Sequence, residues 1–217
     1  MFLGHYALAL VAKRRVPETS LGVLVAAAQL PDLVWPVFLL LGWERVGPGD
    51  HGFTALDFTY YPWSHSLLMD VGWGLAAALA YLAWRRRDAR GAIAVALLVV
   101  SHWLLDFPMH RPDLPLYPGG AARLGLGLWN HPVATIIIEG AMWITGVALY
   151  ATANPPADRT GRYAFWGLIV LLTAIYLANL SAATPTDMRA VAWGALGGML
   201  VPPWAAWADR HRRSARA

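Results

Sequence analysis

Six long apolar segments constrain the fold of this 217-residue chain more than any other feature of its sequence. A helix needs about 20 mostly apolar residues to cross a bilayer. The segments that meet this length are residues 20–42, 65–84, 91–110, 132–153, 163–182 and 188–208. A shorter apolar stretch, Phe2 to Ala12, precedes them. The sequence therefore predicts an all-α integral membrane protein, a bundle of about six transmembrane helices plus a short N-terminal half-helix.

The composition agrees with a membrane protein and limits the chemistry of any site. Only 14% of the residues are charged, whereas a soluble domain has about a quarter. There is no cysteine, so any metal must be held by His, Asp or Glu. No internal repeat or linker divides the chain. We predict one polytopic domain over residues 1–217, with a metal-site half (1–139), accessory helices (140–208) and a basic cytoplasmic tail (209–217).

The basic residues predict how the chain is oriented in the membrane. When the segment ends alternate between two sides, 13 of the 17 basic residues fall on one side, which leaves Arg45, Arg111, Arg123 and Arg189 opposite. The positive-inside rule makes the richer side cytoplasmic and places the C-terminus there. Because the basic residues follow the segment ends rather than one face, we expect no nucleic-acid partner. The first apolar stretch has no basic start, so we expect the mature protein to keep it.

Five acidic or imidazole side chains lie inside the apolar segments, where each charge costs about 2.5–3.5 kcal/mol to insert. They are Asp32, Asp70, His102, Asp106 and Glu139. Such side chains need partners inside the bundle, so they mark a candidate site. Asp70 follows His65 by five residues and therefore faces away from it on a helix, which favours a packing role.

His102 and Asp106 form the strongest local pattern. Residues four apart lie on one helix face and can bind one ion together, although in a soluble helix the same pair is typical of a surface or capping contact. His110 lies four residues further on. Pro108 disfavours helix at the residue before it, so we expect His110 to swing out of line at a kink and reach a shared centre.

Depth counting connects the separated residues. At 1.5 Å per residue, Asp32 lies roughly 18 Å from the cytoplasmic end of its segment, His102 about 16 Å and Asp106 about 22 Å. His65 starts the second segment at the outer interface, and His5 can join only if the half-helix leaves its own start buried. The alternatives are a proline kink that Asp32 satisfies, an interfacial His65 and a helix-to-helix hydrogen bond from Glu139.

The same motifs carry a resemblance over roughly residues 1–118. They are Gly4-His5, Leu30-Pro31-Asp32, Ser64-His65-Ser66 and Ser101-His102 through Asp106. With them the chain resembles the YdjM-like family of bacterial membrane-bound metal-dependent hydrolases, which are distantly similar to zinc-dependent phospholipase C. The chain departs from the family at Val34, where a second acidic residue is usual. The resemblance implies a multi-pass enzyme of the bacterial cytoplasmic (inner) membrane.

The residues and the resemblance together predict a membrane-embedded hydrolase that cleaves a lipid-borne ester or phosphoester near the outer leaflet with a metal-activated water. Zinc is the expected metal, and Mn or Fe is also permitted by nitrogen and oxygen ligands. Asp106 or Glu139 would accept the proton, and Arg111 or Arg123 would hold a phosphate. The expected metal ligands are His5, Asp32, His65, His102, Asp106 and His110.

Two other classes of protein stay open at this point. A metal or proton carrier predicts a polar path through the cytoplasmic half, but the inner ends of the segments are almost purely apolar. A structural membrane protein, whose polar residues only lock helices together, predicts that these residues do not converge. The partners expected of the hydrolase are the membrane and a lipid or lipid-linked substrate, and the sequence does not fix the oligomeric state.

Overall fold

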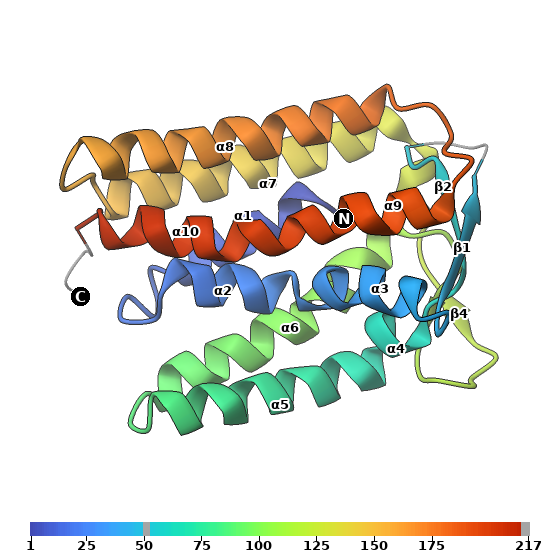
Figure 1. The fold of residues 1–217 in the computed structure, drawn as a ribbon, viewed down its shortest axis with the longest axis horizontal. Helices are drawn as coiled ribbons and strands as arrows, with labels where there is room; N and C mark the ends of the chain where they lie inside the picture. Colours follow the sequence, from blue (N-terminus) through green and yellow to red (C-terminus); the bar gives the residue numbers. More distant parts are fainter. Residues whose placement is uncertain (50–52, 214–217) are drawn as a thin grey trace.

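Helices dominate the structure, a computed structural model that describes residues 1–49 and 53–213, and most of them lie along its long axis (Figure 1). The α-helices are α1 (Leu3–Ala12), α2 (Leu21–Ala28), α3 (Leu30–Leu40), α4 (Pro62–His65), α5 (Leu67–Trp84), α6 (Ala89–Met109), α7 (Pro132–Ala153), α8 (Arg159–Leu180), α9 (Met188–Ala195) and α10 (Val201–Arg210). Two short 3-10 helices are η1 (Leu128–Asn130) and η2 (Leu196–Leu200). The strands form two antiparallel pairs, β1 (Arg45–Pro48) with β2 (Leu56–Tyr60) and β3 (Leu114–Pro115) with β4 (Arg123–Leu124).

The all-α membrane fold is confirmed, and the described part of the chain has fewer continuous spans than predicted. Helices α5, α6, α7 and α8 are long and apolar enough to cross a membrane, and α2 with α3 adds a fifth span if the bent pair counts as one. The predicted segment 188–208 is divided into α9, η2 and α10. Glycines weaken helix in this segment, and the 3-10 stretch contains Gly197 and Gly198.

The predicted segment 20–42 is broken rather than continuous. Helix α2 ends before Gln29, and α3 leaves it at an angle of 55°. Pro31 lies in the first turn of α3, where its missing N–H would have no partner in the helix anyway. The break places Asp32 in the first turn of a new helix inside the bundle.

The half-helix α1 starts in the middle of the molecule and runs toward one end (Figure 1). Its first turns are buried, and Leu3 and Leu10 belong to the main hydrophobic core. It contacts α7 at backbone distance, because a Cβ added to Gly146 would lie 2.8 Å from the carbonyl oxygen of Ala7. His5 therefore lies in the bundle interior. The start of the half-helix is buried, which was the condition for His5 to join the site.

The strands and the turns between long helices lie at opposite ends. The β1–β2 pair is at the right of Figure 1, whereas the α5–α6 and α7–α8 turns and the end of α10 are at the left. His51 lies in a glycine-rich segment that makes it no candidate ligand, and it falls outside the described residues, as do the last four residues of the predicted tail. The described part of the tail is anchored, because Arg212 donates to the carbonyl oxygens of Asn154 and Gly161.

We predict that Gly146→Ala destabilises the protein, because the new methyl group would push α1 away from α7. Overpacking of this kind costs about 1–3 kcal/mol. Thermal unfolding in detergent should show a lower midpoint for this variant. The matched control is Gly140→Ala on the same helix, where an added Cβ meets no atom within 4 Å among the described residues. Equal midpoints for the two variants would contradict close packing of α1 on α7.

Candidate metal centre

Five of the six predicted metal ligands, from four helices, fall within two groups that could hold a metal ion. His110 belongs to neither group, but its Nε2 lies 3.6 Å from Asp106 Oδ2. His5 comes from α1, Asp32 from α3, His65 from α4, and the pair His102 and Asp106 from α6, while His110 follows α6. Five of these side chains are at most 5% exposed, whereas Asp32 is 37% exposed. The cluster is therefore a buried centre that is open at Asp32. The convergence contradicts the reading in which these residues only lock separate helix pairs.

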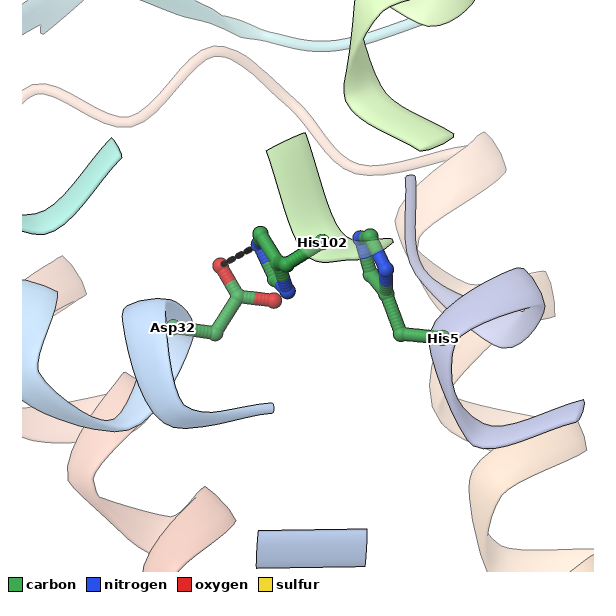
Figure 2. Close-up of side chains that lie close together, drawn as sticks. All are labelled: His5, Asp32 and His102. Atoms are coloured by element: carbon green, nitrogen blue, oxygen red, sulfur yellow. Dashed lines mark ion pairs between the residues drawn. The ribbon is translucent and has the colours of Figure 1, made fainter. Parts of the chain in front are cut away.

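Two groups of three residues have ligand atoms close enough to share an ion. One consists of His5, Asp32 and His102, and the other of His65, His102 and Asp106; in each, the ligand atoms lie within 4.8 Å of one another. Ligands that share one metal at about 2.0–2.1 Å are separated by roughly 3–4 Å. Figure 2 shows the first group, with His5 and His102 ring to ring and the carboxylate of Asp32 facing His102. His102 belongs to both groups and is the centre of the cluster.

Two carboxylates lie beside the four histidines, and His102 lies beside both of them. Asp106 Oδ1 lies 3.1 Å from His5 Nε2, and its Oδ2 lies 3.4 Å from His102 Nε2 and 3.6 Å from His110 Nε2. Asp32 Oδ1 lies 3.2 Å from His65 Nε2 and 3.7 Å from His102 Nε2. The N-terminal amine of Met1 also contacts Asp106 Oδ1. Each imidazole thus presents Nε2 to a carboxylate.

Outer contacts orient three of the rings. His102 Nδ1 lies 2.8 Å from the carbonyl oxygen of Ala28, His110 Nδ1 lies 2.8 Å from Asp113 Oδ1, and His65 Nδ1 lies 2.7 Å from Ser64 Oγ. A carbonyl oxygen only accepts, so His102 Nδ1 carries the proton and Nε2 has a free lone pair. Metal-binding histidines are oriented in this way in most proteins.

Unsatisfied buried nitrogens support the same interpretation. Within residues 1–49 and 53–213, His102 Nε2 and His5 Nδ1 are buried and have no hydrogen-bond partner. Burying a polar atom without a partner costs free energy. A cation bound at these ring nitrogens, beside the two carboxylates, would satisfy them, so the residues present fit a directly bound metal ion.

Groups at the outer edge of the centre have altered acidity. Burial and the neighbouring carboxylate of Asp113 raise the pKa of Tyr61 well above its usual range, and the Tyr61 hydroxyl donates to Asp113 at 2.7 Å. Burial also raises the pKa of Glu44, although hydrogen bonds from Ser64 and Trp63 oppose this. Tyr61 therefore stays a hydroxyl at neutral pH and holds Asp113 against His110.

Glu139, the other predicted proton acceptor, belongs to α7, and its side chain lies beside the start of α1. Its Oε2 accepts hydrogen bonds from the backbone N–H groups of Phe2 at 3.0 Å and Leu3 at 2.8 Å. It belongs to neither metal-binding group. These contacts match the helix-to-helix alternative, and a catalytic role for Glu139 stays a prediction.

The two predicted substrate-binding arginines lie in the connection between α6 and α7, and both donate hydrogen bonds to other residues of that connection. Arg111 Nε donates to Asn130 Oδ1 at 3.0 Å, and Arg123 donates to the carbonyl oxygen of Gly120 at 2.7 Å. Binding of substrate by these side chains stays a prediction.

The sequence did not indicate the outer partners Glu44 and Asp113. Asp113 follows His110 by three residues, a spacing that could have suggested the contact. Glu44 reaches Ser64 across 20 residues of chain and two strands, so no local pattern indicates it.

The comparisons with known proteins point to a different activity from the one predicted. No family model matches the chain, and no solved structure matches it. A curated relative named heme A synthase, from Methylorubrum populi, is 28% identical over 163 residues, which cover 72% of this chain and 42% of the relative. A heme A synthase from Chelativorans is 28% identical over 154 residues, covering 66% of this chain and 40% of the relative. The chain spans about two fifths of the length of these relatives.

These relatives correct several predictions. They are named as synthases of a haem, so the YdjM-like and phospholipase C resemblance, the hydrolase activity and the phospholipid substrate are wrong. Zinc is wrong as well, because haem is an iron compound. The carrier and structural alternatives do not fit relatives named as enzymes. The physical reason for the error is that short His and Asp motifs define a ligand set, and such a set fixes neither the metal nor the reaction.

The helices and the relatives agree on where the protein is located. The membrane-spanning helices and the bacterial relatives identify a multi-pass protein of a bacterial inner membrane. The polar centre accordingly lies among helices that face lipid, and its charges depend on one another for stabilisation.

We predict that Glu139→Ala destabilises the protein by about 1–3 kcal/mol, because one buried and one partly buried N–H group at the start of α1 would lose their acceptor. Chemical unfolding in detergent, followed by circular dichroism, measures the change. Glu18→Ala is the control, since Glu18 is exposed. If both variants unfold at the same denaturant concentration, Glu139 does not hold α1.

Proposed function

We propose that this chain is a membrane-embedded oxidoreductase whose buried centre binds iron directly through histidine and aspartate. The observation that carries the proposal is that each three-residue group contains two histidines and one aspartate. This ligand set, with positions left open, is typical of non-haem Fe(II) oxygenases. The names of the two relatives support iron-related chemistry independently.

A resident haem does not fit this cluster. The porphyrin fills four positions around its iron, which leaves only two axial positions for protein ligands. Here three side chains converge on each of the two places. In addition, the rings of His5 and His102 are stacked, with centroids 3.7 Å apart and planes within 8°, so no macrocycle can lie between them. We therefore assign the centre to an iron ion.

Bound iron would supply one-electron redox chemistry, and the protein supplies position and environment. His5, His65 and His102 hold ring nitrogens toward one region, and their burial limits the access of water to it. Asp32 is the exposed member, so a reacting molecule would approach beside it. Because the centre lies among membrane-spanning helices, we propose a substrate that is dissolved in the bilayer, such as a lipid or lipid-linked molecule.

We predict that the protein purified anaerobically without chelator contains iron and that His102→Ala loses at least nine tenths of it. His102 belongs to both groups, so its loss affects either binding place. Elemental analysis by mass spectrometry measures the metal per chain. The matched control is His131→Ala, because His131 is exposed and belongs to neither group. Protein that contains zinc instead of iron, or a His102→Ala variant that keeps its iron, would overturn the proposal.

We also propose that the C-terminus is cytoplasmic. Basic residues flank helix ends that lie at the left of Figure 1: Arg85–Arg87 follow α5, and Arg159 begins α8. An excess of Lys and Arg marks the cytoplasmic side of membrane proteins. The strands and the open side of the centre would then lie toward the periplasm.

The absence of cysteine makes this orientation easy to test. Glu18 and Ala121 are exposed and lie on opposite sides in the proposed topology. We predict that a membrane-impermeant maleimide labels Ala121→Cys in intact cells and labels Glu18→Cys only after the cells are opened. The reverse pattern would place the C-terminus outside.

A further inference from the structure

We infer that Glu44 is a positioning residue that acts through Ser64 to keep the proton of His65 on Nδ1, so that Nε2 faces the iron centre with a free lone pair. The role in iron binding rests on the proposed function, whereas the position of the proton does not. Glu44 lies between α3 and β1, outside the six predicted ligands, and is 2% exposed.

Three donors from one short segment meet the Glu44 carboxylate. Oε1 accepts from the backbone N–H groups of Trp63 and Ser64, each at 2.8 Å. Oε2 accepts from the hydroxyl of Ser64 at 2.7 Å. The two N–H contacts hold the start of α4, and the hydroxyl contact is additional to that role.

The hydroxyl contact determines where the proton of His65 lies. A serine hydroxyl has one proton, and an ionised carboxylate can only accept, so Ser64 donates its proton to Glu44. Ser64 Oγ also lies 2.7 Å from His65 Nδ1. With its own proton directed to Glu44, Ser64 must accept there, and His65 must donate from Nδ1. Nε2 is then free of hydrogen in the neutral ring and lies 3.2 Å from Asp32 Oδ1.

Without a metal, a competing arrangement is available. Asp32 also accepts hydrogen bonds, so it favours a proton on His65 Nε2, the atom that a metal needs. If Ser64 were free to turn its hydroxyl toward Nδ1, the ring could adopt that form. Glu44 prevents the turn, and the difference between the two forms depends on its charge.

The test uses Glu44→Gln, which keeps the size of the side chain and an oxygen for the backbone N–H groups. Its amide can donate to Ser64 Oγ, so Ser64 can turn its proton toward His65. We expect nitrogen-15 NMR of metal-free protein labelled in histidine, at pH 8, to show His65 with its proton on Nδ1 in the parent and on Nε2 in the variant. The His65→Ala spectrum assigns the signal. Loss of an outer partner of this kind weakens metal binding about 10–100-fold.

Two serine variants test the same path if Glu44→Gln fails to fold. Ser64→Ala removes the acceptor for His65 Nδ1 but keeps the backbone N–H contacts with Glu44, and we expect it to move the proton to Nε2. Ser64→Thr keeps a hydroxyl and should retain the parent signal and iron affinity. Glu18→Gln controls for the loss of one acidic charge from an exposed position.

The outcomes separate the two claims. A His65 proton that stays on Nδ1 in both Glu44→Gln and Ser64→Ala overturns the inference, whether or not the parent binds iron. A proton that moves, in a protein whose parent binds no iron, supports the role of Glu44 and overturns the proposed function. Movement of the proton together with a weaker iron affinity supports both.

Discussion

The rest of the centre depends on the contacts between the buried carboxylate of Asp106 and the imidazoles around it. A charge at this depth is expensive unless opposite or polar partners surround it. Its two oxygens face His5 on one side and His102 and His110 on the other. Two of these partners come from the same helix and its end, but His5 does not. The bundle must therefore bring the start of α1 into its interior.

A helix that starts inside a bundle exposes N–H groups where no water can satisfy them. Glu139 solves this problem, because it accepts from Phe2 and Leu3 at the start of α1. The close contact of Gly146 with Ala7 then lets α1 lie directly against α7. One face of α7 thus accepts the N–H groups at the start of α1 and also packs along the side of α1. Together these contacts fix how His5 faces the centre.

The sequence was a good guide to residues whose pattern is local or whose burial is costly. The spacing of His102 and Asp106 and four of the apolar segments match continuous helices of the structure, whereas the segments 20–42 and 188–208 are broken in it. The contacts of Glu44 and Asp113 depend on loops and strands that fold back on the helices. The sequence of these loops and strands has no regular spacing of apolar residues from which their positions could be predicted. The activity was beyond the motifs, because two histidines and an aspartate serve hydrolytic and redox metals alike. The relatives, rather than the geometry, corrected it.

The break between α2 and α3 links the charge of the centre to its access. A continuous helix would leave Asp32 among backbone groups that are already paired, whereas the bend of 55° creates a helix start beside it. The N–H groups of a first turn are partly positive and stabilise a carboxylate. The same bend opens the packing there, so the carboxylate that the helix start stabilises is also the exposed ligand. Straightening the segment would therefore remove the opening and raise the free-energy cost of the charge together.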